Sequence, residues 1–150
     1  MVANRSVPPS HLLPQVFYED VAAALNWLTS TLGFSEYYRF KLPDGTLHGA
    51  MIYLGEAWVM LKSPGRTSTS PNKLGHSTQS LMIFVENVDA HREQSRSGGA
   101  VILEELFDTE YGERQYTVQD PQGHPWTFAT HIRDVSPDAW GAIPAATRDC

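Results

Sequence analysis

Hydrophobic and polar positions follow the same order twice along the chain, and each time they predict a strand, a helix and three further strands. In the first stretch, an apolar strand over residues 13–18 leads to Asp20, a residue type that favours helix N-caps. The apolar residues after this cap recur at helical spacing: Val21, Leu25, Leu28 and Leu32. Gly33 predicts the end of the helix. Three strands are expected after it, over residues 35–41, 46–54 and 57–62.

The second stretch repeats this order with a more polar helix. A strand over residues 79–85 leads to Asn87, again a residue type that favours N-caps, and the helix extends to Gly98–Gly99. Three strands are then expected over residues 100–107, 114–119 and 125–131. Turn sequences rich in Pro and Gly interrupt both stretches, PDG at residues 43–45 and DPQG at residues 120–123.

Two short matches support an internal duplication. VFYEDV at residues 16–21 resembles IFVENV at residues 83–88, an offset of 67 (83 minus 16). GEAWVML at residues 55–61 resembles GHPWTFA at residues 123–129, an offset of 68 (123 minus 55). Two matches at nearly one offset indicate that the chain consists of two similar units.

Segments rich in Pro, Ser, Thr or Gly divide the chain. They predict a flexible lead-in over residues 1–10, a linker over residues 63–78 and a tail over residues 135–150. We therefore expect one domain over residues 11–134, with units over residues 12–62 and 79–134.

Composition and charge narrow the classes of partner. Of the 150 residues, 41% are hydrophobic and 19% charged, which is typical of a globular domain. The net charge is −6 without a run of Lys or Arg, so nucleic acid and anionic membranes are not expected as partners. No apolar run reaches the roughly 18 residues of a membrane span, and no secretory leader is evident, so a cytoplasmic location is expected. The only cysteine is Cys150, which excludes an intrachain disulfide and a cysteine-based metal cluster.

At this point the chain resembles a known family. FYEDVAAALNWLTSTLGF, VENVDAHREQSRSGGAVILEE and DTEYGERQYTVQDPQGHPWTFATH are similar to segments of the vicinal oxygen chelate superfamily, which includes glyoxalase I, extradiol dioxygenases and bleomycin-resistance proteins. The resemblance covers residues 12–134. It implies an α+β fold in which two βαβββ units form a curled mixed sheet around a cavity. It also implies a homodimer, because the two units around a cavity often come from two chains.

The resemblance also implies where a metal would bind. The four positions that hold a divalent ion in the superfamily correspond here to Leu13, Val59, Ser80 and Thr127. Alkyl groups contribute nothing to metal binding and neutral hydroxyls contribute little. A shift by one residue offers only Pro, Gln, Met, Leu and Phe, so we expect no metal and no cofactor. His124 and His131 lie seven residues apart on one strand, which places them on opposite faces.

The alternation of side chains along strands predicts the wall of the cavity. If the metal positions face the cavity, the wall and its mouth include the following candidate ligand-binding residues: Gln15, Phe17, His48, Val59, Ser80, Met82, Phe84, Tyr111, Arg114 and Thr127. Trp58 and Trp126 are expected on the other face, towards the helices. The alternatives are that these side chains fill a closed core, and that Arg114 forms a turn salt bridge instead of binding an anionic group.

This wall favours binding of a small hydrophobic or aromatic compound. The resemblance to bleomycin-resistance proteins implies a metal-free protein that sequesters such a compound, for example an antibiotic. The alternative is a lyase, isomerase or dioxygenase of the same superfamily that uses His48 or Glu113 as a base, or a metal held by residues other than those at the four positions above. A third hypothesis is an interaction module with a filled cavity.

Overall fold

The computed structural model describes residues 2, 5–6 and 11–146. The first unit has the predicted order: β1 (Gln15–Phe17), α1 (Val21–Thr31), β2 (Ser35–Lys41), β3 (Leu47–Leu54) and β4 (Ala57–Lys62). So does the second: β5 (Leu81–Phe84), α3 (Val88–Ser97), β6 (Val101–Asp108), β7 (Glu113–Gln119) and β8 (Pro125–His131). The α+β fold and both βαβββ units are confirmed. No helix of the described residues is long and apolar enough to cross a membrane.

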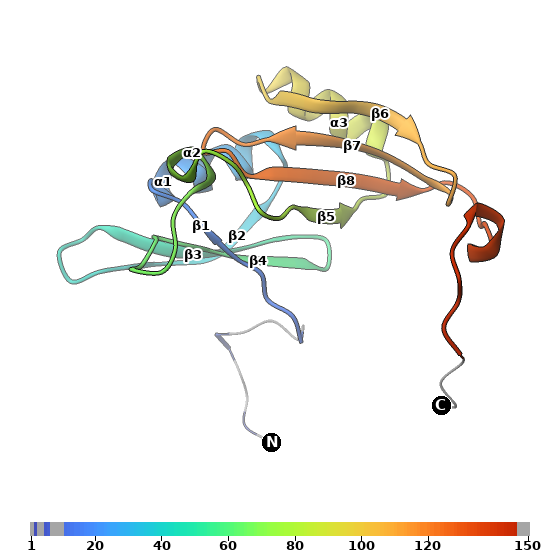
Figure 1. Cartoon of the computed structure of the whole chain (residues 1–150). Coiled ribbons are helices and arrows are strands. Elements are labelled where there is room, and N and C mark those ends of the chain that lie inside the picture. Colours follow the sequence, from blue (N-terminus) through green and yellow to red (C-terminus); the bar gives the residue numbers. More distant parts are fainter. Residues whose placement is uncertain (1, 3–4, 7–10, 147–150) are drawn as a thin grey trace.

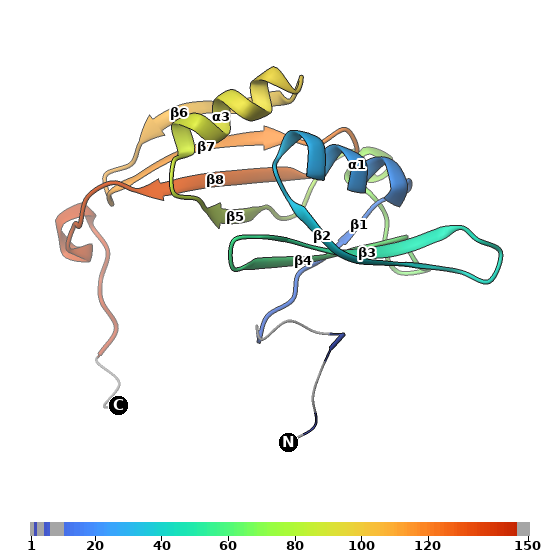
Figure 2. The ribbon, with the colours of Figure 1, turned by 180° about the vertical axis from the view of Figure 1, so that it is seen from behind.

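The strands form two four-stranded sheets, in the orders β1-β4-β3-β2 and β5-β8-β7-β6 (Figure 1). In each sheet the first strand of the unit runs parallel to the last, and the other neighbours are antiparallel. Figure 2 shows α1 and α3 on the same side of the molecule, each packed on its own sheet. Each sheet therefore has one face towards a helix and one face without a helix, which we call its open face.

The residues next to each helix explain where it begins. The side chains of Asp20 and Asn87 accept hydrogen bonds from the backbone N–H groups of Ala23 (2.9 Å) and Ala90 (3.0 Å). Both are N-caps as predicted, because they satisfy a donor that the first helical turn leaves free.

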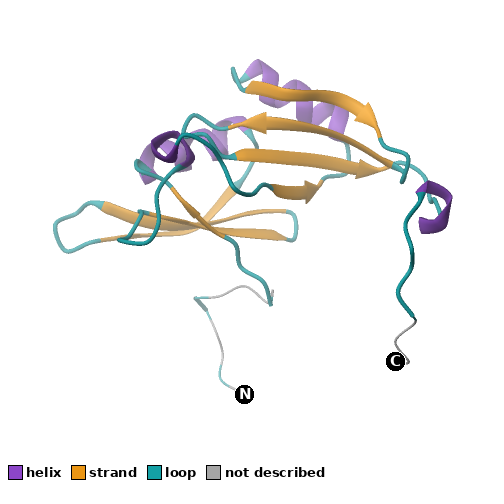
Figure 3. Ribbon diagram, viewed as in Figure 1, coloured by secondary structure: helices purple, strands orange, loops and turns teal. Residues whose placement is uncertain are grey.

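The linker contains a structured element that the sequence pattern did not predict. A short helix, α2 (Pro71–Leu74), begins after the N-cap Ser70 and lies beside the turn between β7 and β8 (Figure 3). The Asn72 amide donates to the carbonyl of Pro121 (3.0 Å), and its backbone N–H donates to that of Gln122 (3.2 Å). The linker is thus fixed to the second unit.

Both units contribute to one hydrophobic core on the helix side of the sheets. Leu28 of α1 is fully buried, and the ring of Phe34 meets that of Trp126 edge to face at 5.4 Å. Apolar burial of this kind contributes about 1.5–3 kcal/mol for each large side chain. The units therefore form one folded body.

A buried polar network on α3 joins the two units. His91 Nε2 lies 2.8 Å from the carbonyl of Leu32 and Nδ1 lies 2.7 Å from the hydroxyl of Tyr116. A carbonyl only accepts, so Nε2 carries the proton and Nδ1 accepts from Tyr116. Burial lowers the pKa of His91, which keeps the ring neutral in this arrangement.

Two buried tyrosines predict that the protein loses stability in alkali. Burial raises the pKa of Tyr116 to about 12, and burial followed by the charge of Asp120 raises the pKa of Tyr18 well above its ordinary value. In the unfolded chain tyrosine ionises near pH 10. Stability from this source is therefore complete below pH 10 and falls above it, by up to about 1.4 kcal/mol per pH unit for each tyrosine.

Urea unfolding between pH 9 and pH 12 measures this slope. Tyr116→Phe should make it shallower, whereas Tyr111→Phe, at a half-exposed ring, should leave it unchanged. Equal slopes for wild type and Tyr116→Phe would show that Tyr116 ionises alike in both states.

The observed register corrects one predicted face. Val16 pairs with Leu61 and Ile83 with Phe128, and both members of the second pair follow those of the first by 67 residues. The match of GEAW with GHPW at an offset of 68 is therefore one residue out of register. Two residues connect β3 to β4 but five connect β7 to β8, so the Gly-to-Trp spacing falls at different points of the two strands.

A shift of one residue reverses the face of every side chain on a strand. Val59 is only 2% exposed and lies in the core towards α1, so its predicted place on the cavity wall is wrong. Trp58 was expected in the core and instead lies on the open face, stacked on Tyr53. Trp126 lies in the core as expected.

Candidate ligand-binding site

The open face of the second sheet is an apolar surface with a few polar groups. Met82 and Phe84 of β5 are 46% and 57% exposed, although both are large apolar residues. Register places Thr127 next to Met82, and Ala129 next to Phe84. The hydroxyls of Thr127 and Thr117 are 2.8 Å apart. The structure thus brings together Met82, Phe84 and Thr127, as the alternation predicted.

The open face of the first sheet is mainly aromatic. Trp58 stacks on Tyr53 with ring centroids 4.7 Å apart, and Tyr37 meets Trp58 edge to face at 5.2 Å. Tyr37 lies two residues after Ser35, which pairs with Tyr53, so strand alternation places Tyr37 on the face that carries Trp58. We call Tyr37, Tyr53 and Trp58 the aromatic platform. Such flat surfaces suit stacking of planar rings.

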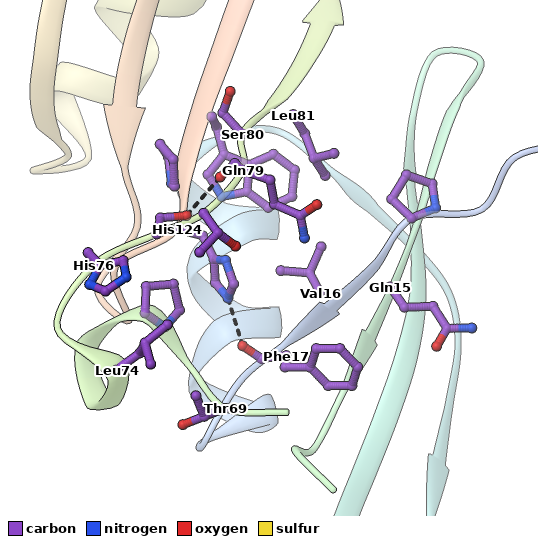
Figure 4. A pocket seen from close by; sticks show the side chains of 16 residues that line it. Gln15, Val16, Phe17, Thr69, Leu74, His76, Gln79, Ser80, Leu81 and His124 are labelled. Atoms are coloured by element: carbon purple, nitrogen blue, oxygen red, sulfur yellow. Dashed lines mark hydrogen bonds between the residues drawn. The ribbon is translucent and has the colours of Figure 1, made fainter. Parts of the chain in front are cut away.

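A pocket of about 180 Å³ lies where β1 and β5 approach each other below α2. Figure 4 shows Gln15 and Phe17 on one side of it and Gln79 and Ser80 on the other, with His124 between. His124 Nε2–H donates to the carbonyl of Phe17 (2.7 Å), which fixes this ring structurally. The predicted residues Gln15, Phe17 and Ser80 therefore meet at one pocket.

Asp120 holds the two units together behind this pocket. Its Oδ2 accepts from the Tyr18 hydroxyl (2.7 Å) and from Trp126 Nε1–H (3.1 Å). Its Oδ1 accepts from the backbone N–H groups of Gln122 and His124, both at 3.0 Å. The DPQG turn therefore supplies a buried carboxylate that bridges the units, in addition to its predicted role as a turn.

The remaining candidates are more dispersed than predicted. Arg114 forms ion pairs with Asp108 (2.7 Å) and with Asp89 of α3 (3.4 Å), and these pairs raise its pKa. Its guanidinium is thus engaged on the helix side, so its predicted place at the cavity mouth is wrong. The other prediction from the sequence, that Arg114 forms a salt bridge, is correct.

Tyr111, His48 and Glu113 occupy three different environments. The Tyr111 ring lies 5.3 Å from that of Trp140, a contact that orders the start of the tail. The His48 ring meets Phe40 at 5.7 Å, and within the described part of the chain it has no hydrogen-bond or carboxylate partner. Glu113 lies on the other sheet, on its open face, paired with His131. The two candidate bases are therefore not parts of one catalytic pair.

The residues at the four superfamily metal positions do not fit a divalent ion. On the observed register these residues are Leu13, Met60, Ser80 and Thr127. A thioether, two hydroxyls and an alkyl group are a poor donor set for Zn²⁺, Mn²⁺ or Fe²⁺. No group of three or more His, Cys, Asp or Glu side chains is placed to hold a metal within the described residues.

The sequence signals for the missed residues were present but weak. Val16 pairs with Leu61 in the core, so alternate residues counted along β4 from Leu61 place Trp58 on the open face. The Gly–Trp match places Trp58 on the wrong face. The face of Tyr37 follows from the same alternation, counted from Ser35, which pairs with Tyr53.

The chain is similar to known proteins in sequence and in fold. Residues 9–128 match the model of the Glyoxalase/Bleomycin resistance protein/Dioxygenase superfamily. The uncharacterised protein Mb0911c of Mycobacterium bovis is 30% identical over 143 residues, which span 92% of this chain and 94% of that protein.

Two solved structures share the fold. TioX from Micromonospora sp. ML1 is 33% identical with a TM-score of 0.69, covering 82% of this chain and 99% of that chain. TnmS3 from Streptomyces sp. CB03234, described as an antibiotic binding protein, is 20% identical with a TM-score of 0.67, covering 83% and 98%.

Proposed function

This chain belongs to the glyoxalase/bleomycin resistance protein/dioxygenase superfamily, and from that premise we propose that it binds a planar aromatic small molecule without converting it. The observation that carries the proposal is the aromatic platform, on which the flat faces of Trp58 and Tyr53 lie outside the core. Stacking on such rings adds to the gain from apolar burial. The antibiotic-binding relative TnmS3 supports an antibiotic as the class of ligand.

We further propose that two copies of the chain complete the cavity. The open face of the second sheet carries large exposed apolar side chains at both of its edges: Met82 and Phe84 on β5, and Phe107 on β6. Large exposed apolar side chains on a sheet face that no helix covers favour an interaction site. In a homodimer this open face lies opposite the aromatic platform of the partner, and the ligand is enclosed between them. Light scattering of the purified protein should give a mass of two chains.

The alternative is an enzyme of the same superfamily that uses Glu113 or His48 as a base. Glu113 is the stronger candidate because it has an imidazole partner 3.1 Å away. Turnover separates the two hypotheses, because sequestration leaves the ligand chemically unchanged.

Titration with 2-methoxynaphthalene tests the proposal. We expect quenching of tryptophan fluorescence, saturation at a fixed ratio of ligand to chain, and recovery of unaltered ligand by mass spectrometry. Metal analysis of protein purified without chelators should find far less than one Ni, Zn, Fe or Mn per chain. Catalytic consumption of an aromatic substrate, or about one tightly bound metal per chain, would overturn the proposal.

A further inference from the structure

A carboxylate and an imidazole meet at one end of the open face of the second sheet. Glu113 of β7 and His131 of β8 are direct cross-strand partners, and His131 Nδ1 lies 3.1 Å from Glu113 Oε1. The side chain of Glu113 is 15% exposed, whereas that of His131 is 53% exposed. One member of the pair is therefore held inside, and the other reaches solvent.

The hydrogen bond to Glu113 determines which nitrogen of the neutral His131 ring carries the proton. A carboxylate oxygen only accepts, so Nδ1 carries the hydrogen and donates it to Glu113. Nε2 of the neutral ring then has a free lone pair. Neutral histidine otherwise exists as a mixture of two tautomers, so Glu113 selects the form that presents an acceptor.

Glu113 is well placed for this role. Its backbone N–H donates to the Thr109 hydroxyl (3.0 Å), and its carbonyl accepts from the Thr109 N–H (2.8 Å). Its second carboxylate oxygen, Oε2, is buried and has no hydrogen-bond partner among the described residues. His131 is therefore the group that the Glu113 carboxylate holds by a hydrogen bond.

The surroundings of the pair are apolar and aromatic. The next cross-strand step on the same face joins Gln115 to Ala129, and Ala129 pairs with Phe84. Phe107 of β6 pairs with Gln115 from the other side. A ring that packs on Phe84 can therefore direct a substituent along this face towards His131.

We propose that His131 accepts a hydrogen bond from an aromatic hydroxyl of the ligand, with Glu113 as the positioning residue. This inference rests on the proposed function and specifies the ligand as a phenol or hydroxylated polycycle. A phenol fits because it joins an acidic donor to a flat apolar ring. A carboxylate ligand is disfavoured by repulsion from Glu113. An ammonium ligand is disfavoured by Arg133, which donates to the carbonyl of Thr109 at 2.9 Å on the adjacent turn.

Two probes that differ only at the hydroxyl test the proposal, 2-naphthol and its methyl ether 2-methoxynaphthalene. The intact protein at pH 8 should bind 2-naphthol about tenfold more tightly, the expected value of one hydrogen bond to a polarised acceptor. His131→Phe should remove this preference and keep the affinity for the ether. His11→Phe changes an exposed histidine outside the second unit and should keep the preference.

A second measurement addresses Glu113 directly and needs no ligand. Nitrogen NMR of the imidazole should show neutral His131 protonated at Nδ1 in the wild type. In Glu113→Leu it should change to the ordinary mixture in which Nε2–H predominates. An unfolded variant would give the same mixture, so the amide spectrum of Glu113→Leu must keep the dispersion of the wild type for the tautomer change to report positioning by Glu113.

The outcomes distinguish the inference from the function on which it rests. Binding of neither probe overturns both. Equal affinity for both probes, a preference that survives His131→Phe, or an Nε2–H tautomer in the wild type overturns this inference alone and leaves aromatic binding in place.

Discussion

Replacing Asp120 by alanine is expected to lower the free energy of unfolding by about 3–5 kcal/mol, the range for breaking a buried polar network around a charge. The carboxylate accepts four hydrogen bonds, from the side chains of Tyr18 and Trp126 and from two backbone N–H groups. Its removal leaves several buried donors without acceptors, and each unsatisfied buried group costs about 1–3 kcal/mol. Because Tyr18 belongs to the first unit and Trp126 to the second, the loss weakens the junction between them.

Urea unfolding at pH 7 measures the change, with two control variants. Tyr18→Phe removes a single donor and should cost about 1 kcal/mol. Asp134→Ala removes an exposed aspartate and should change stability by less than about 0.5 kcal/mol. If Asp120→Ala were as stable as Asp134→Ala, the bridging role assigned to this carboxylate would be wrong.

Replacing Trp58 by alanine is expected to weaken the binding of 2-methoxynaphthalene about 10- to 100-fold. The substitution removes the largest ring of the aromatic platform and also its contacts with Tyr53 and Tyr37. A stacked ring combines apolar burial with aromatic contact, and losing about 1–3 kcal/mol corresponds to this range. The fold should persist, because Trp58 lies outside the buried core.

The neighbouring residue supplies a matched control. Val59→Ala creates a small cavity in the core towards α1 and should cost about 1–3 kcal/mol of stability while leaving ligand affinity within twofold. Calorimetric titration and urea unfolding of both variants give the full comparison. The reverse result, with affinity lost in Val59→Ala and retained in Trp58→Ala, would restore the register expected from the Gly–Trp match.

Trp58→Ala and Val59→Ala test which face of β4 each side chain occupies, the point on which the prediction from the sequence was wrong. The face on which a side chain lies depends on its position in the alternation along the strand. The Gly–Trp match assumed the same spacing from turn to strand in both units, but the two turns differ in length. In the second unit the wall residues Met82, Phe84 and Thr127 lie on one face as predicted, because the five-residue turn before β8 leaves Thr127 in register with Met82. In the first unit the same reasoning selected Val59 in place of Trp58.

Local signals in the sequence determined most of the fold. Asp20 and Asn87 begin their helices through contacts three residues away, so the residues that decide these boundaries are adjacent in the chain. The positions of the strands follow from the local alternation of apolar and polar residues, and the duplication follows from the internal sequence repeat.

Only the tertiary structure decided which side chains meet. Arg114 turns to Asp89 on α3, Asp120 joins Tyr18 to Trp126, and Glu113 finds His131 across β7 and β8. Each of these contacts joins groups that alternation alone does not relate, and each depends on strand register, turn length or helix docking. Those quantities are set by packing of the whole domain, so the sequence predicted the two units and the type of wall, while the structure chose the residues that form it.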